Sequence, residues 1–248
     1  MAVENSNRRI VCWFSCGAAS AVATKLTVNK YGPEKVVVAS CVVENEHPDN
    51  ERFLQDCEKW YGLKIVRLRS QKYKDCWEVW EKNRYLAGIN GAKCTTEMKK
   101  LVRQKFQKIT DVQIFGFTVE EKARAERFRQ NNPEVNLVTP LIDQGLTKTD
   151  CFIEIQKVGI ELPVMYKLGY NNNNCIGCVK GGAGYWNKIR KDFPDVFARM
   201  AALEKQIGAR LTKHKGKRVF LDDLPPSAGL KQKEPDMECG LWCKDDNK

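Results

Sequence analysis

The chain has 248 residues and is 42% hydrophobic, so it can bury a core without disulfide bonds and is too apolar to be disordered throughout. Its 42 lysines and arginines against 31 acidic residues give a net charge of +11, which favours an anionic partner such as a nucleotide, sulfate or nucleic acid. No apolar run approaches the ~20 residues of a membrane span, and residues 1–9 lack the apolar segment of a secretory signal. We therefore expect a cytoplasmic protein with no membrane partner, and a homo-oligomer stays open.

Strand-like and helix-like segments alternate through the first two thirds of the chain. In chain order we predict a strand at residues 9–14, a helix at 18–30, a strand at 35–43, a helix at 48–61, a strand at 64–68, a helix at 93–108, a strand at 112–117, a helix at 120–130, a strand at 135–141 and a helix at 147–158. Repeated strand–helix units predict an α/β fold, with a parallel sheet and helices on both faces. Ligands of such sheets bind beyond the carboxyl ends of the strands, at the switch point.

After residue 161 the alternation gives way to segments rich in Gly, Asn and Pro. We therefore predict two domains: an α/β nucleotide-binding domain at residues 1–161, and a small cysteine-rich region at 162–248. We expect this second region to be loop-rich and helical and to pack on the ligand edge. Residues 171–174 (NNNN) are the only low-complexity patch.

Cysteine and histidine usage limits the chemistry. Two histidines, His47 and His214, leave little room for a mechanism built on a Ser–His or Cys–His pair. Eleven cysteines in a chain with no secretory signal argue against a disulfide framework. Five lie in apolar-patterned segments and are interpreted as core residues: Cys12, Cys41, Cys57, Cys76 and Cys151. Five others have a chemical context, in a Gly/Asn-rich loop, before a basic helix or near the C-terminal end: Cys94, Cys175, Cys178, Cys239 and Cys243.

Basic residues gather in three clusters. They are Lys99, Lys100, Arg103, Lys105 and Lys108, then Arg124, Arg127 and Arg129, and finally Lys213, His214, Lys215, Lys217 and Arg218. Each cluster taken alone is typical of a solvated helix face or a basic loop. Together they leave a nucleic-acid partner open.

Ser15, Gly17 and Ser20 follow the first strand in the pattern Ser-x-Gly-x-x-Ser. Gly17 would let the backbone approach an anion, while the amides of the helix start and the two hydroxyls donate to it. The loop is not a Walker A motif, because Lys25 lacks the preceding Gly. The alternative is an ordinary strand–helix turn capped by Ser15.

The segment Ser-Cys-Gly-Ala-Ala-Ser-Ala resembles the PP-loop of the adenine-nucleotide alpha hydrolase superfamily. Within this superfamily the chain is most similar to the phosphoadenosine phosphosulfate (PAPS) reductase-like family. Some members of that family are encoded by bacteriophages. Further blocks follow in the family's order: GFTVEEKAR at 116–124, TPLID at 139–143, LPVMY at 162–166, CIGC at 175–178 and ECGL at 238–241. The chain departs from the family's pattern at Thr95, Asp143 and Trp242.

This resemblance implies a Rossmann-like (HUP-type) fold and an oxidoreductase that reduces PAPS or adenosine phosphosulfate (APS) to sulfite. Cys239 would be the nucleophile, and a thioredoxin-like protein the reductant. The nucleotide-binding residues would be Ser15, Cys16, Gly17, Ala18, Ala19, Ser20, Val43, Gly116, Glu121 and Arg124. Glu121 and Arg124 also fit an ordinary i,i+3 ion pair. Trp242 replaces the family's His, so activation by that His does not carry over.

The resemblance also implies a metal centre, because family members that carry a cluster use a Cys-Cys pair followed by a distant Cys-x-x-Cys. Cys175 and Cys178 match the second pair, and Cys94 matches half of the first, where Thr95 replaces its neighbour. We therefore expect a [4Fe-4S] cluster held by Cys94, Cys175, Cys178 and Cys243, with Cys239 as another source of the fourth ligand and zinc as the alternative metal.

Two further hypotheses stay open. The first is an ATP-dependent PP-loop enzyme that adenylates tRNA or DNA for sulfur transfer, with pyrophosphate held by the loop. The second is a non-catalytic protein that binds a nucleotide or a nucleic acid. Only the ATP-dependent enzyme needs a pyrophosphate site.

Overall fold

The computed structural model describes residues 8–88 and 91–229, which form two compact units. The first unit takes in the described residues of Met1–Val42, Pro48–Leu68 and Arg103–Asn173, and the second those of Val43–His47, Arg69–Val102 and Asn174–Lys248. These are units of packing, so the domains expected at residues 1–161 and 162–248 stay a prediction.

A five-stranded parallel sheet forms the centre of the first unit. Its strands are β1 (Ile10–Trp13), β2 (Val36–Cys41), β3 (Ile65–Leu68), β6 (Val112–Ile114) and β7 (Asn136–Val138). They lie in the order β3-β2-β1-β6-β7, and Ile10 on the central strand is paired with both Val36 and Val112. The chain thus builds outward on one side of β1 and then on the other. The predicted Rossmann-like α/β fold class is confirmed.

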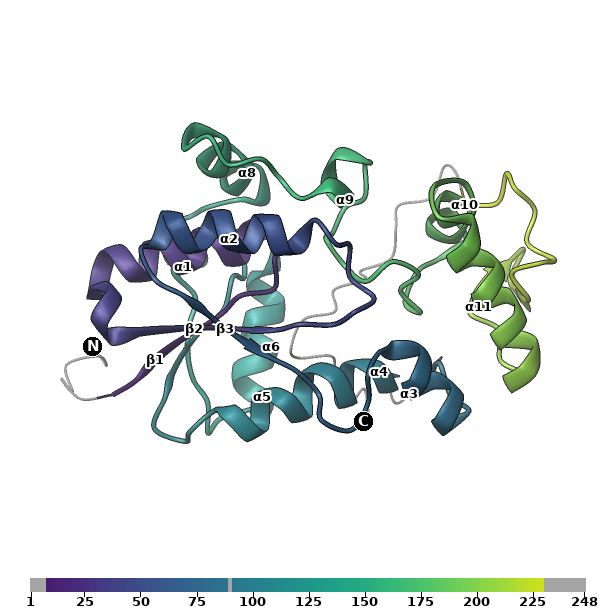
Figure 1. Cartoon of the computed structure of the whole chain (residues 1–248), viewed down its shortest axis with the longest axis horizontal. Coiled ribbons are helices and arrows are strands. Elements are labelled where there is room, and N and C mark those ends of the chain that lie inside the picture. The colour runs from purple at the N-terminus through teal and green to yellow at the C-terminus, as the bar shows by residue number, and fades with distance from the viewer. Residues whose placement is uncertain (1–7, 89–90, 230–248) are drawn as a thin grey trace. The chain divides into compact units, whose positions relative to one another are not determined.

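Helices cover both faces of this sheet. Figure 1 shows α1 (Ala18–Tyr31) and α2 (Asn50–Tyr61) on one face and α6 (Lys122–Asn131) on the other. α8 (Lys148–Lys157) packs against α1. Shorter elements of this unit are η1 (Pro33–Lys35), η3 (Val119–Glu121), α7 (Pro140–Asp143) and α9 (Val164–Lys167), while α5 (Leu101–Phe106) crosses into it from the second unit.

Apolar side chains between β1 and α2 hold this unit together. All four residues of β1 are buried, and Phe14, which follows it, stacks on Phe53 with 6.0 Å between ring centroids. Tyr61 meets Phe14 edge-on at 6.3 Å. α2 ends at Gly62, whose φ of 75° lies in the left-handed region that glycine adopts without strain.

The second unit is more helical than the sequence indicated. It contains α3 (Cys76–Asn83), β4 (Ala87–Gly88), β5 (Gly91–Ala92), α4 (Lys93–Thr95), the π-turn η2 (Thr96–Lys100), α10 (Ala183–Asp192), α11 (Pro194–Ile207), β8 (Thr212–His214) and β9 (Lys217–Val219). The helix predicted at residues 93–108 is present as α4, η2 and α5 in succession. We did not predict α3, α10 or α11 as separate elements.

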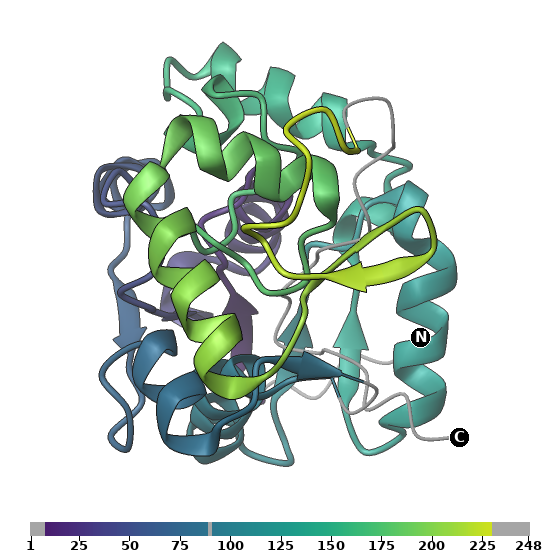
Figure 2. The ribbon, with the colours of Figure 1, turned by 90° about the vertical axis from the view of Figure 1, so that its right-hand side faces the viewer.

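Packing around α11 organises the second unit. The Arg199 guanidinium lies 4.2 Å from the Trp77 ring centroid, which joins α11 to α3. The buried Glu204 carboxylate accepts the N–H groups of Leu211 and Leu221, the latter at 2.7 Å, on either side of the β8–β9 hairpin. Figure 2 shows this hairpin, in yellow-green, folding back after α11. Burial raises the pKa of Glu204, even though both N–H groups oppose the shift.

The described helices are short. α1 and α11 have 14 residues each, whereas an apolar helix needs ~20 to cross a bilayer. None in residues 8–88 or 91–229 is long and apolar enough to do so.

Candidate functional site

The loop after β1 and the loop after β6 meet at the switch point of the sheet, because β1 lies between β2 and β6. Gly116 follows β6 and touches the backbone at the start of α1. A Cβ on Gly116 would lie 2.7 Å from the Ser20 nitrogen and 2.8 Å from the Ala19 carbonyl carbon. Only glycine permits so close an approach. The structure therefore brings the predicted loop and Gly116 together.

Two hydroxyls shape this loop from within. Ser20 Oγ accepts the Ser15 N–H at 3.1 Å and donates to the Gly17 carbonyl at 2.8 Å. Ser15 Oγ, on an exposed residue, lies 3.2 Å from Ser20 Oγ. Gly17, the N-cap of α1, has no side chain of its own to cap the helix, and Ser15 Oγ bonds to Ser20 Oγ, so the helix cap by Ser15 that the alternative assumed is not formed. The hydroxyls and the first amides of α1 thus lie in one loop.

Cys16 adopts an unusual backbone conformation in the middle of this loop. Its φ of 56° lies in the left-handed region, which costs a non-glycine residue ~1 kcal/mol or more and is common at functional sites. Asn173 Nδ2 donates to the Cys16 carbonyl at 2.7 Å and to Asn50 Oδ1 at 2.8 Å. Asn173 Oδ1 is buried and has no hydrogen-bond partner among the described residues. Neither asparagine was predicted as a site residue, and the NNNN patch was the only signal in the sequence.

Tyr166 closes the other side of the loop. Its hydroxyl accepts the backbone N–H groups of Ala18 and Asn173, and a Cβ on Gly17 would lie 3.3 Å from it. Burial raises the pKa of Tyr166 to about 12, despite those two N–H groups, so the phenol stays protonated at neutral pH. Tyr166 thus takes up the first amide of α1, and an anion at this loop would be bound by the amides that follow.

Glu121 and Arg124 form the ion pair that the sequence allowed. Their charged atoms lie 2.6 Å apart, and Glu121 also accepts the Thr118 N–H at 3.2 Å. The Arg124 guanidinium lies 5.1 Å from the Phe117 ring centroid. Val43 is buried in the second unit, where its carbonyl accepts the Glu46 N–H at 3.0 Å. Nucleotide contacts of Glu121, Arg124 and Val43 stay predictions.

The basic clusters differ in exposure. Lys99 is buried against Glu46 at 2.9 Å, and burial lowers the pKa of Arg103 to about 9. The interpretation of the first cluster as a solvated helix face is therefore wrong for these two residues. In the third cluster, by contrast, Lys213, Lys215 and Lys217 are exposed on the β8–β9 hairpin.

Three cysteines of the second unit meet at their thiols. Interaction with the Cys175 thiol, then with the Cys94 thiol, and burial raise the pKa of Cys76 well above its usual range. Cys76 is buried, as expected of a core residue, but the core interpretation missed its thiol partners. We call Cys76, Cys94, Cys175 and the nearby Cys178 the cysteine group.

The side chains of the cysteine group are of a type that binds metals, but they are not arranged around a metal position. In residues 8–88 and 91–229, no three or more His, Cys, Asp or Glu side chains are arranged around a position for a metal ion. Cys239, the predicted nucleophile, and Cys243, the predicted fourth ligand, lie outside the described residues. Their roles stay predictions.

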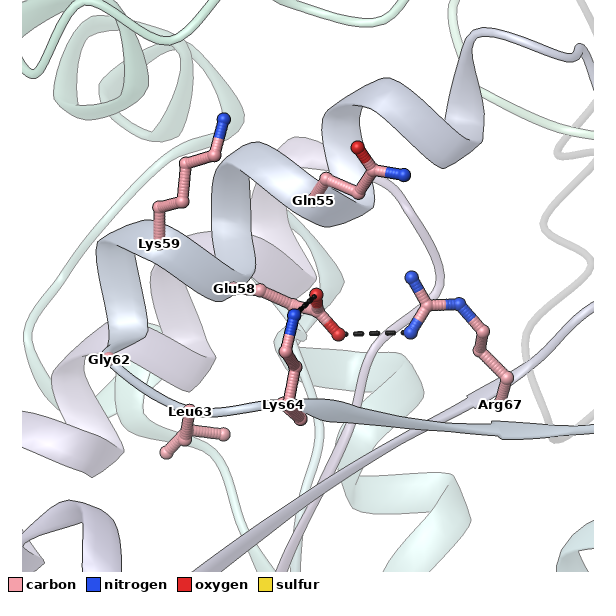
Figure 3. A pocket seen from close by; sticks show the side chains of 7 residues that line it. All are labelled: Gln55, Glu58, Lys59, Gly62, Leu63, Lys64 and Arg67. Atoms are coloured by element: carbon pink, nitrogen blue, oxygen red, sulfur yellow. Dashed lines mark hydrogen bonds and ion pairs between the residues drawn. The ribbon is translucent and has the colours of Figure 1, made fainter.

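A pocket of about 730 Å³ opens elsewhere, beside the turn between α2 and β3 (Figure 3). It is lined by Gln55, Glu58, Lys59, Gly62, Leu63, Lys64 and Arg67. Glu58 lies at its centre and pairs with Lys64 at 3.0 Å and Arg67 at 2.9 Å. The turn precedes β3, so this pocket is remote from the carboxyl ends of the strands, and we do not assign the nucleotide to it.

Comparison with known proteins gives distant similarities. No protein-family model matches the sequence. The uncharacterized protein MJ0066 of Methanocaldococcus jannaschii is 23% identical over 210 residues, which are 79% of this chain and 41% of that protein. The chain thus spans about two fifths of this relative's length. The solved structure of the U34-tRNA thiolase NcsA from Methanococcus maripaludis with its [4Fe-4S] cluster is 11% identical, with a TM-score of 0.38, over 82% of this chain and 72% of that one.

Proposed function

We propose that this chain is a PP-loop enzyme that binds ATP at Ser15–Ser20 and activates an acceptor in tRNA or DNA for sulfur transfer. The acceptor oxygen would attack the α-phosphate, and pyrophosphate would leave. The observation that carries this proposal is the convergence of Ser15, Gly17 and Ser20 with the start of α1 at the switch point of the sheet. Such a loop offers amide and hydroxyl donors to a pyrophosphate.

A pyrophosphate site distinguishes this proposal from sulfonucleotide reduction. A reductase releases no pyrophosphate and needs no hydrogen-bond donors to hold it. This chain has both loop serines, Ser15 and Ser20, whose hydroxyls can serve as such donors. Reduction would instead depend on Cys239, which lies outside the described residues. PAPS or APS reduction with a thioredoxin-like protein is therefore the competing hypothesis.

The cysteine group is proposed as the seat of a metal centre, a [4Fe-4S] cluster first and zinc second. Its thiols are the ligands that both prefer, and they come from separate segments that fold together. A bound cluster would supply iron for sulfur or redox chemistry, and zinc would supply a structural tie. The protein's own contribution is to keep the thiols buried within the second unit.

The test uses the whole chain, purified without oxygen. We expect release of AMP and pyrophosphate from ATP, stimulated by tRNA or DNA. Ser20→Ala should weaken ATP binding by about tenfold, which corresponds to ~1.4 kcal/mol, because the loop loses its internal donor and acceptor. Thr27→Val is the matched control, since Thr27 also bonds a backbone carbonyl of α1 but lies two turns from the loop.

The opposite pattern would reject the proposal. It consists of thioredoxin-dependent sulfite release from PAPS or APS, lost in Cys239→Ser, with no pyrophosphate released from ATP under any acceptor. Equal ATP affinities of Ser20→Ala and Thr27→Val would remove the loop from the nucleotide site.

A further inference from the structure

The register of the β8–β9 hairpin sets basic residues opposite each other. Lys213 lies opposite Arg218, and His214 lies opposite Lys217. Like charges that face each other across an antiparallel pair destabilise it, whereas opposite charges in the same positions stabilise it. The hairpin is therefore less stable than one with an acidic residue in either strand. Local rules of this kind are broken mainly at functional sites.

The turn of the hairpin departs from the usual sequence as well. Lys215 and Gly216 join the two strands with φ angles of 47° and 80°, both in the left-handed region. Two-residue hairpin turns with this backbone favour Asn-Gly or Asp-Gly, because longer side chains are strained there. Lys215 places one more cation at the turn, which points away from α11 in Figure 2.

The base of the hairpin is fixed in place. The buried Glu204 carboxylate of α11 holds backbone N–H groups on both sides of the hairpin. The Arg218 guanidinium donates to the Arg210 carbonyl at 2.7 Å, just before β8. Because a preorganised element loses less conformational entropy on binding, this anchoring suits a docking element.

No acidic side chain balances these cations. Within the part of the chain that the structure describes, no ion pair includes the lysines or the arginine of the hairpin, Lys213, Lys215, Lys217 and Arg218. The nearby Asp222 pairs with Lys205 instead. Solubility and protection of a strand edge are served by charges of either sign. A cluster of one sign therefore indicates an anionic partner.

The basic residues occupy both faces of the hairpin. Side chains directly opposite each other share a face, and successive side chains alternate between faces. Lys213 and Arg218 therefore share one face. His214 and Lys217 share the other, which also carries the buried Thr212 nearer the base. A flat anionic surface would contact only one face, whereas a groove between two phosphate backbones contacts both.

From this arrangement we infer that the β8–β9 hairpin inserts into the major groove of duplex DNA and contacts phosphates on both sides of the groove. The major groove of B-form DNA is ~12 Å wide and admits a two-stranded β-ribbon. The major groove of A-form RNA is deep and too narrow for side chains to read. The inference rests on the function proposed above and names duplex DNA, in place of tRNA, as the nucleic acid that carries the acceptor.

The experiment measures binding of the whole chain to a short fluorescent DNA duplex by anisotropy, without ATP. Lys213→Glu and Lys217→Glu reverse one charge on each face of the hairpin. Each change should weaken binding about tenfold or more, because a phosphate contact becomes a repulsion. Lys213→Glu should also raise the Tm by about 1–3 °C, since Arg218 gains an acidic residue opposite it.

Lys74→Glu is the matched control, because Lys74 is an exposed lysine of the same unit and the net charge changes equally. It should weaken DNA binding less than about threefold, since a charge remote from the DNA is screened by salt. An equal loss in the control and in the hairpin variants would overturn the inference. Loss of affinity in only one hairpin variant would indicate contact with a single face, and insertion into a groove would be wrong.

An RNA duplex of the same sequence and a tRNA are the comparison ligands. Tighter binding of either one than of duplex DNA would make the inference wrong. Release of AMP and pyrophosphate from ATP in the presence of tRNA would then still support the proposed function. Hairpin-dependent binding of duplex DNA without ATP cleavage under any acceptor would reject the proposed function and retain the hairpin as a DNA-binding element.

Discussion

At the scale of single residues, identical side chains in one short run differ in burial and in their hydrogen bonds. In the asparagine patch at 171–174, Asn173 is buried and donates to the Cys16 carbonyl and to Asn50, whereas Asn171 is exposed. Both acceptors are oxygens, so the position requires an N–H donor. The loop that is proposed to hold the nucleotide therefore depends on an amide more than 150 residues away in sequence.

Asn173→Asp tests this dependence. A carboxylate would place oxygen against two carbonyl-type oxygens, and we expect the free energy of unfolding to fall by about 1–3 kcal/mol, since buried acceptors are left unsatisfied. Urea unfolding measures the loss, and Asn171→Asp should change it by less than ~0.5 kcal/mol. Equal effects of the two changes would show that the Asn173 contacts do not hold the loop.

The site was only partly predictable at this scale. Ser15, Gly17 and Ser20 lie within six residues, so their pattern could be recognised in the sequence, and Gly116 followed from the family resemblance. Asn173 and Cys76 act through partners that only the fold brings near. A buried cysteine in an apolar segment looks the same in sequence whether it packs or meets other thiols, which is why Cys76 was assigned to the core.

At the scale of elements, the junction of α2 and β3 depends on one carboxylate. Glu58, with 5% of its side chain exposed, accepts the Ile65 N–H at 2.9 Å and pairs with Lys64 and Arg67. Burial opposes its ionisation, but the Ile65 N–H and the two cations prevail and lower the pKa of Glu58 below its usual value of 4.5. Its stabilising effect is therefore complete above that value and is lost as the pH falls through the lower, folded-state pKa.

Glu58→Gln should lower the free energy of unfolding by about 1–3 kcal/mol at pH 7, because three donors lose a charged acceptor. The difference from the unaltered chain should shrink as the medium is acidified through the lowered pKa of Glu58, below its usual value of 4.5, where Glu58 itself becomes neutral. Urea titrations at several pH values measure this. Glu154→Gln, in an exposed i,i+3 pair with Lys157, should cost at most ~0.5 kcal/mol at either pH. A difference that persists in acid would contradict the assignment.

Elements were predictable where burial leaves a repeating pattern. All five strands of the sheet were expected, and β1 and β2 show the clearest signal, because buried parallel strands are apolar on both faces. α3 was missed, since it has only eight residues, although Asp75 before it and Glu78 within it gave a helix-start signal that the structure confirms at 2.8 Å. α10 and α11 were missed because the segments after residue 161 were interpreted as loop-rich from their Gly, Asn and Pro content, although Pro194 is a normal first residue of a helix.

At the scale of the whole molecule, the basic residues behind the net charge of +11 differ in their exposure to solvent. Lys99 and Arg103 are buried, while the β8–β9 hairpin exposes Lys213, Lys215 and Lys217. If a nucleic acid is the acceptor, these three lysines are the strongest described candidates for phosphate contacts.

Replacing those three lysines by alanine should weaken nucleic-acid binding and reduce the slope of log Kd against log salt by up to ~3, about 0.9 for each lost contact with duplex phosphates. Fluorescence anisotropy at several salt concentrations measures both. A control that removes three exposed lysines of the first unit, Lys30, Lys35 and Lys59, should leave the slope nearly unchanged. Equal losses in the two triple variants would indicate bulk charge, with no role for the hairpin.

The two units are interleaved along the chain, which passes between them after residues 42, 47, 68, 102 and 173. Ribosomes deliver a chain from its N-terminal end at ~5–20 residues per second, so neither unit can be finished early. Cys76 and Cys94 leave the ribosome long before Cys175, and the thiol contacts can form only when that last segment arrives. A metal loaded during synthesis would meet an incomplete ligand set. If the proposed metal centre forms, its loading is therefore expected to follow synthesis of the whole second unit.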